Sequence, residues 1–157
     1  VASLTVVDAT ACYGEEAKPG WEASGQRALL EGFEAMVPFQ IQRWFTPDYA
    51  TREPAELKAA VDVFLRNSPQ AYLETCRLLG QADERPRLPV YAGPACVVVG
   101  EDDYATPPAM AREIADGLRR AVLRHYTPIE APGAVVKAIV LALENVNATP
   151  AQENSSE

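Results

Sequence analysis

Residues 95–108 read ACVVVGEDDYATPP, and this stretch decides the fold class. A short apolar run that is rich in β-branched residues and ends at a turn is typical of a strand buried within a sheet. Gly100 ends the run, acidic residues follow, and the two prolines open a helix that is expected to extend to about residue 118. Carboxylates at the carboxyl end of a parallel strand face the crevice in which α/β proteins bind ligands. Two readings of Asp102 and Asp103 are open: a functional carboxylate, or a cap of the following helix.

The segment before this stretch predicts one more strand and then several short helices. Residues 1–7, VASLTVV, form a second β-branched apolar run, which Asp8 ends. A polar segment with glycine and proline over 13–25 is expected to be a loop. Pro38 is expected to kink or split the first helix that follows. Apolar residues at helical spacing predict these helices over 26–42, 54–67 and 69–79.

The remaining segments complete an α/β pattern. A proline-rich connector over 85–94 is not expected to be helical, and residues 125–130 are a weaker strand candidate. Residues 134–146 predict a helix that is apolar nearly all round, while the polar tail over 147–157 is expected to be disordered. Strands that alternate with helices predict a parallel sheet. Because this sheet has three strands at most, an outer strand would lack a neighbour.

Composition and charge narrow the possible classes of function. A chain of 157 residues, 48% of them hydrophobic, can form one domain with its own core. The formal charge of -8 provides no basic stripe, which argues against nucleic acid and membrane partners. A cytoplasmic location is expected, since no apolar run reaches transmembrane length and no leader pattern is seen. Three cysteines have neither disulfide nor metal-ligand spacing and are expected to be reduced thiols: Cys12, Cys76 and Cys96.

The acidic loop resembles the place at which α/β-hydrolases carry the acid of their catalytic triad. In that family a strand is followed by Gly-x-x-Asp-x-x-x-Pro. Gly100, Asp103 and Pro107 match this pattern position by position. The resemblance implies that Asp103, and not Asp102, is the acid that orients a histidine and stabilises its imidazolium during proton transfer.

Other segments extend the resemblance to about residues 1–133. Residues 6–10, VVDAT, resemble the family's sixth strand, and the helices over about 21–80 resemble the small cap that follows it. Within the cap, residues 43–47, RWFTP, and the stretch 72–83 resemble the 3-oxoadipate enol-lactonase branch. The resemblance implies a partial α/β-hydrolase fold with about three parallel strands and a helical cap insertion, in which residues 1–146 are the C-terminal portion of the hydrolase domain.

The resemblance also implies a place for the substrate. Arg43 and Trp44 would lie near it, because an arginine fork suits the carboxylate that enol-lactone substrates carry. A second reading of these two residues is open, in which Trp44 packs the cap and Arg43 faces solvent. The expected partner is a small ester or lactone, and no cofactor and no metal is implied.

Two members of the family's triad are not where the resemblance expects them. No Gly-x-Ser-x-Gly occurs among the 157 residues, so the nucleophile and the oxyanion-hole loop are expected to precede Val1. The family's histidine is expected in a loop near Gly133, but Pro132, Gly133 and Ala134 run straight into a helix, so this loop is shortened and the catalytic histidine is expected to be missing. The only histidine, His125, stands eight residues earlier and is a weaker catalytic candidate. The chain is therefore expected to be an ester or enol-lactone hydrolase that is inactive by itself.

Two alternatives belong to other classes of function. A non-catalytic remnant would use the unpaired first strand and the apolar last helix to associate with a complementary N-terminal chain or with another copy. In the other alternative, Glu101, Asp102 and Asp103 bind magnesium, as in receiver domains. That fold needs further strands and another aspartate, for which few residues remain.

Overall fold

The computed structural model describes residues 1–125 and 132–147, and it confirms the predicted α/β class. Three strands form one sheet in the order β1 (Leu4–Val7), β2 (Ala95–Val99) and β3 (Ala121–His125). Both pairings are parallel, so all three carboxyl ends lie at the same edge. The register pairs the Cα atoms of Val99 and His125.

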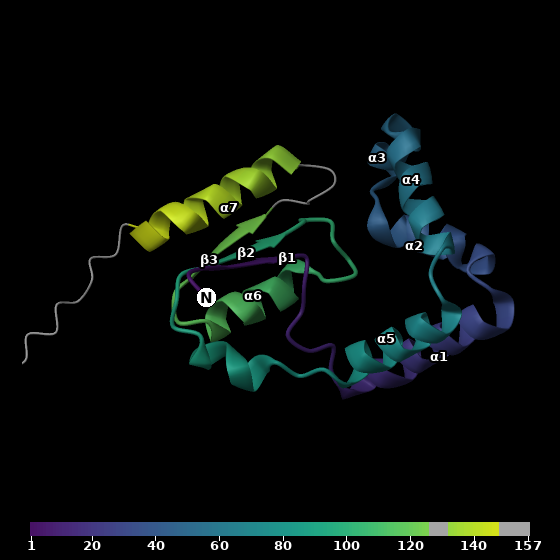
Figure 1. Cartoon of the computed structure of the whole chain (residues 1–157), viewed down its shortest axis with the longest axis horizontal. Helices are drawn as coiled ribbons and strands as arrows, with labels where there is room; N and C mark the ends of the chain where they lie inside the picture. The colour runs from purple at the N-terminus through teal and green to yellow at the C-terminus, as the bar shows by residue number, and fades with distance from the viewer. Residues whose placement is uncertain (126–131, 148–157) are drawn as a thin grey trace, which may run out of the picture.

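The central strand is buried because helices cover both faces of the sheet (Figure 1). Val97 and Val99 pack with Ala111 and Ile114 of α6 (Pro108–Gly117). The alternate residues Cys96 and Val98 pack with α7 (Pro132–Asn147). Side chains of a strand alternate between the two faces, and all five residues of β2 are buried. This explains why β2 reads as a continuous apolar run.

A helical cap is inserted between β1 and β2. The two ends of the insertion lie side by side, since Cys12 and Asp83 form an antiparallel bridge and Glu84 N–H donates to Ala11 O at 2.8 Å. Figure 1 shows helices α1 and α5 running side by side away from the sheet, with α2, α3 and α4 beyond them. The cap helices are α1 (Lys18–Glu31), α2 (Val37–Trp44), α3 (Pro47–Arg52), α4 (Pro54–Leu65) and α5 (Pro69–Gln81). The described residues also contain three 3₁₀ helices: Glu15–Ala17, Glu34–Met36 and Arg85–Val90.

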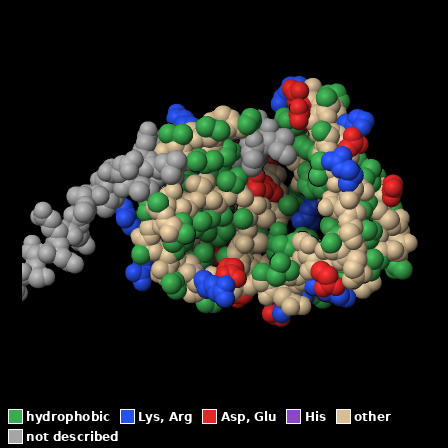
Figure 2. Space-filling view, in the orientation of Figure 1, with side chains coloured by type: hydrophobic (Ala, Val, Ile, Leu, Met, Phe, Trp, Pro, Cys, Tyr) green, Lys and Arg blue, Asp and Glu red, His purple; other side chains and the backbone are tan. Residues whose placement is uncertain are grey.

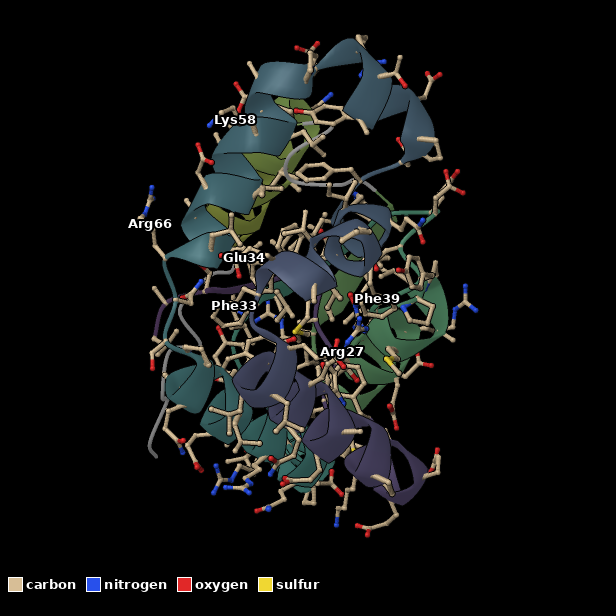
Figure 3. All side chains as sticks on the ribbon, turned by 90° about the vertical axis from the view of Figure 1, so that its right-hand side faces the viewer. Arg27, Phe33, Glu34, Phe39, Lys58 and Arg66 are labelled. Carbon is tan, nitrogen blue, oxygen red and sulfur yellow. The ribbon has the colours of Figure 1, made fainter. Side chains whose placement is uncertain are left out.

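The cap has a hydrophobic core of its own, separate from that of the sheet. Ala28, Phe33, Met36 and Phe64 are buried together. The Phe33 ring, labelled in Figure 3, lies with its centroid 4.6 Å from that of Phe64. Helices α1 and α5 approach closely at Gly25, where an added Cβ would lie 2.9 Å from the Leu73 Cα. Only a glycine fits this contact without displacing the neighbouring backbone.

Several boundaries differ from the sequence prediction for local reasons. Helix α1 begins at Lys18, so the loop expected over 13–25 is too long. Pro19 does not prevent this, because the first helical turn needs no N–H from that residue. The expected break at Pro38 lies at Gly32 instead, which has a φ of 79°, and Pro38 occupies the first turn of α2. The connector over 85–94 contains a 3₁₀ helix although a proline lies inside it.

The last strand lies earlier than predicted. Strand β3 ends at His125, whereas the expected strand begins there. At this edge of the sheet Val122 and Arg124 are exposed while their neighbours are partly covered, so the pattern is less apolar than that of β2. Residues 126–130, and the tail from 148 that was expected to be disordered, lie outside the described residues. None of the helices over the described ranges has the length and apolar character needed to cross a membrane.

Candidate active site

A cavity of about 1100 Å³ lies between the carboxyl edge of the sheet and the cap. Figure 2 shows the molecule hollowed at this place, with acidic and basic side chains inside the hollow. The strand ends contribute Asp8 and residues 100–106 to its lining. The cap contributes polar and aromatic side chains, among them Tyr13, Trp21, Ser24, Phe39, Gln40, Arg43, Trp44, Phe64 and Tyr72. The predicted site residues Asp103, Arg43 and Trp44 thus line one cavity.

Asp103 is held in the loop after β2 by three hydrogen bonds. Its Oδ1 accepts the N–H groups of Ala105 at 2.8 Å and Thr106 at 2.9 Å. Its Oδ2 accepts the Thr106 hydroxyl at 2.7 Å. The residue that caps α6 is Pro107, which makes no side-chain cap bond. Asp103 therefore orders the loop and does not cap the helix, while Asp102 beside it is exposed.

Asp8, which was not among the predicted site residues, also lines the cavity, close enough to Asp103 for the two charges to interact. It follows β1 with a φ of 43°, in a region that side-chain-bearing residues rarely adopt. Its Oδ1 accepts the Gly100 N–H at 3.2 Å, which ties the ends of β1 and β2 together. Burial raises the pKa of Asp8, the hydrogen bond from Gly100 lowers it, and the negative charge of Asp103 raises it. The rule that singled out Asp103, a carboxylate at the end of a parallel strand, applies equally to Asp8.

Arg43 and Trp44 both line the cavity, from the last turn of α2. The guanidinium carbon of Arg43 lies 5.4 Å from the ring centroid of Trp21 and 5.9 Å from that of Phe39, within the range of cation–π attraction. Of the carboxylates in the described ranges, none lies within ion-pair distance of Arg43. Trp44 packs edge-on against Phe64, with centroids 5.2 Å apart, and is 38% exposed. Trp44 therefore both packs within the cap and lines the cavity.

Tyr13 also lines the cavity, close enough to Arg43 and Asp103 for both charges to act on its pKa. Burial raises the pKa of Tyr13, while the positive charge of Arg43 lowers it and the negative charge of Asp103 raises it. Its ring packs edge-on against Trp21 at a centroid distance of 4.9 Å. Because the sequence placed Tyr13 at the start of a loop, no helical or strand pattern pointed to this role.

A polar cluster from three cap helices forms another part of the wall. Gln40 Nε2 donates to the Tyr72 hydroxyl at 3.1 Å, and the hydroxyls of Ser24 and Tyr72 are 3.3 Å apart. Gln40 is only 5% exposed, which is unusual for an amide side chain. The three residues are far apart in the sequence, and no local motif brings them together.

The structure corrects the expected position of His125 within the last strand. The predicted strand begins at His125, but His125 is the last residue of β3 and pairs with Val99. Its backbone therefore stands at the carboxyl edge of the sheet, the same edge from which the Asp103 loop leaves β2. The His125 side chain lies outside the described part of the structure, so its catalytic role stays a prediction.

Metal chemistry gains no support at the acidic loop. In the part of the chain whose side chains are described, no three His, Cys, Asp or Glu residues are grouped so as to hold an ion.

Comparisons with known proteins place this geometry in a familiar fold. No family model and no curated protein matches the chain. Among solved structures, an enol-lactonase from Burkholderia xenovorans superposes with a TM-score of 0.82 and 30% identity, over 90% of this chain and 56% of that one. A hydrolase from Pseudomonas aeruginosa matches with a TM-score of 0.80 and 19% identity, over 90% and 55%. A malate-bound thermophilic esterase from Thermogutta terrifontis matches with a TM-score of 0.81 and 22% identity, over 92% and 56%.

The chain thus spans little more than half the length of each of these proteins. The two matches below 25% identity establish the fold alone. The chain has the fold of the C-terminal part of an α/β-hydrolase and is similar to an enol-lactonase.

Proposed function

We propose that the chain carries the acid, the histidine and the substrate-binding cap of a hydrolase for carboxylic esters or enol-lactones. The observation that supports this most is the cavity, which joins Asp103 at the strand ends to Arg43 in the cap. The nucleophile would come from outside the 157 residues, which hold no Gly-x-Ser-x-Gly. The chain alone is therefore inactive in this proposal, and a cytoplasmic setting suits its three free thiols.

The hydrogen bonds of Asp103 leave room for a histidine. A carboxylate has about four acceptor sites. Two on Oδ1 and one on Oδ2 are taken by Ala105 and Thr106. The remaining site on Oδ2 could accept the N–H of one imidazole, and His125 is the residue that we propose for it. The histidine would then deprotonate the external serine, and Asp103 would stabilise the imidazolium that forms.

The N–H donors of Arg43 favour a substrate that carries a carboxylate. A guanidinium carries five N–H donors, and none of them is engaged by a carboxylate of the described residues. The Trp21 and Phe39 rings attract the guanidinium without consuming those donors. A substrate carboxylate would take them bidentately, while the ester or lactone carbonyl lies toward Asp103.

The acid–histidine pair is tested by an NMR titration of the imidazole, which gives a single signal because His125 is the only histidine. We expect Asp103→Asn to move the titration midpoint to lower pH, since loss of the negative charge disfavours the imidazolium. Asparagine keeps an oxygen for the N–H groups of Ala105 and Thr106, and its NH2 group can donate to the Thr106 hydroxyl, so we expect the loop to be retained. The matched control is Asp102→Asn, which removes the neighbouring exposed charge and is expected to have the smaller effect. Equal shifts of the titration midpoint in both variants would contradict the proposed pairing of Asp103 with His125.

A second candidate is an association module, favoured by apolar surface on the sheet part. Strand β1 pairs only with β2 in the described ranges, which leaves its other edge open. Helix α7 exposes Val136 by 59% and Val140 by 46%. A complementary N-terminal chain or a second copy would cover these groups. Light scattering on the purified chain tests association with a second copy. We expect a mass of two or more copies, and a stable monomer would contradict self-association.

A further inference from the structure

Asp8, which neither the resemblance nor the proposed reaction uses, is bound to the end of β2 at the point where the Asp103 loop leaves the sheet. Its N–H donates to Val98 O at 2.9 Å, which continues the parallel pairing of β1 with β2. Its Oδ1 accepts the N–H of Gly100 at 3.2 Å. Gly100 is the first residue after β2, and its carbonyl oxygen accepts the Asp103 N–H at 3.4 Å. Asp8 therefore fixes the residue from which the Asp103 loop departs.

The backbone of Asp8 is held in an unusual conformation. Its φ of 43° lies in the left-handed region, which glycine adopts freely and in which aspartate and asparagine are the best tolerated of the other residues. Among the described residues, Asp8 is the only one other than glycine with a positive φ. Such a conformation persists only where the surrounding contacts hold it. Here the two hydrogen bonds to the end of β2 do so.

Neither the hydrogen bond to Gly100 nor the positive φ needs a negative charge at this position. An asparagine has an equivalent acceptor oxygen and tolerates the same φ. The Asp8 carboxylate is partly buried, and no Lys or Arg of the described residues lies within ion-pair distance of it. The pKa of Asp8 is raised, because burial and the charge of Asp103 outweigh the hydrogen bond from Gly100. The folded chain therefore disfavours the ionised form, and a charge that the fold neither needs nor stabilises points to a function.

The charge of Asp8 stands at the edge of the sheet where a positive charge forms in the proposed reaction. All three strands end at this edge, β1 before Asp8, β2 before the Asp103 loop and β3 with His125. Neighbouring strands are about 4.8 Å apart, so the ends of β1 and β3 are separated by about 10 Å. A negative charge at this distance favours protonation of an imidazole. In the described part of the chain, the other charged residues that line the cavity are Glu101, Asp102 and Arg43.

We propose that Asp8 is a positioning residue of the acid–histidine pair, which anchors the Asp103 loop through Gly100 and adds a second negative charge at the edge where the imidazolium forms. The inference rests on the function proposed above, because the imidazole on which Asp8 acts is that of His125. Asp8 acts from two strands away and not by contact. Its two effects can be separated, since the anchor depends on the acceptor oxygen and the electrostatic effect depends on the charge.

Asp8→Asn tests the charge while keeping an oxygen for the Gly100 N–H. We expect the NMR titration midpoint of the His125 imidazole to fall by about 0.3–0.6 pH units at low ionic strength. This is the range that Coulomb's law gives for charges about 10 Å apart in an effective dielectric constant of about 80 to 40. At neutral pH the variant is expected to be at least as stable to urea as the wild-type chain, since it removes a disfavoured charge. This advantage disappears below about pH 4, where the wild-type carboxyl is neutral in the unfolded chain as well.

Asp8→Gly tests the anchor, because glycine adopts the positive φ without strain but has no acceptor oxygen. We expect hydrogen exchange of the Gly100 amide to be about two- to tenfold faster than in the wild-type chain, the range for one lost hydrogen bond. Asp8→Asn should leave this exchange rate close to the wild-type value. An unchanged rate in Asp8→Gly would show that Asp8 does not hold the loop and would overturn the inference.

The matched control for the charge is Asp116→Asn, which changes the net charge by the same amount. Asp116 is exposed near the end of α6, at the opposite edge of the sheet, where β3 begins, and it does not line the cavity. It is expected to shift the His125 midpoint less than Asp8→Asn does. Equal shifts in the two variants would overturn the inference, as would a loss of stability in Asp8→Asn alone, which would make the charge structural. If Asp103→Asn also leaves the midpoint unchanged, the acid–histidine pair itself fails and the inference fails with it.

Discussion

Replacing Gly25 with alanine is expected to destabilise the cap, although alanine is the better helix former. The added Cβ would lie 2.5 Å from Leu73 Cδ1 and 2.9 Å from the Leu73 Cα, so the backbones of α1 and α5 must separate. Overpacking of this kind costs about 1–3 kcal/mol. The gain in helix propensity offsets roughly 0.5–1 kcal/mol of that. Urea unfolding followed by circular dichroism measures the net loss.

The same helix offers a matched control for this substitution. Gly20 also lies in α1, but a Cβ added there meets nothing within 4 Å. Gly20→Ala is therefore expected to stabilise the chain by roughly 0.5–1 kcal/mol. The two variants should shift the unfolding midpoint in opposite directions. If Gly25→Ala were as stable as Gly20→Ala, helices α1 and α5 would not be in the close contact described.

Replacing Arg43 with methionine is expected to weaken binding of an acidic lactone by about 10- to 100-fold, the range for hydrogen bonds to a charged group. Methionine keeps an unbranched apolar side chain against the Trp21 and Phe39 rings but removes all N–H donors. The ligand to use is a saturated γ-lactone bearing a carboxymethyl group, and the measurement is isothermal titration calorimetry. Arg43→Lys keeps the charge but lacks the planar fork. Its affinity for the lactone should lie between that of the wild-type chain and that of Arg43→Met.

Arg66 provides the control for a general effect of charge. It is an exposed arginine at the end of α4, labelled in Figure 3, and is not among the residues that line the cavity. Arg66→Met changes the net charge by the same amount as Arg43→Met and is expected to leave the affinity for the lactone unchanged. Equal losses of affinity in both variants would mean that binding of the lactone depends only on the overall charge of the chain.

Local signals in the sequence were sufficient for the elements that depend on near neighbours. The boundaries of β2 follow from a run of five buried residues between Pro94 and Gly100. Helix α5 begins as expected, because Ser68 accepts the Ala71 N–H and Pro69 occupies the first turn. These signals are short in range, and no tertiary contact is needed to interpret them.

Features that depend on distant contacts could not be predicted from the sequence. Strand β3 lies at the edge of the sheet, where Arg124 interrupts its apolar pattern, and only its pairing with β2 identifies it. The cluster at Tyr72 joins residues separated by 32 and 48 positions. Asp103, Arg43 and Trp44 were singled out by resemblance, and all three line one cavity. Their roles in catalysis and binding stay predictions.

The separate cap core has a practical consequence for spectroscopy. Both tryptophans of the chain, Trp21 and Trp44, belong to cap helices and line the cavity, while the sheet and its two covering helices have none. Tryptophan emission of this protein, excited selectively over tyrosine, is therefore a signal from the cap alone. Trp21 lies in van der Waals range of the Tyr13 ring and beneath the Arg43 cation. Quenching or a spectral shift on ligand addition would report occupancy of the cavity without any attached dye.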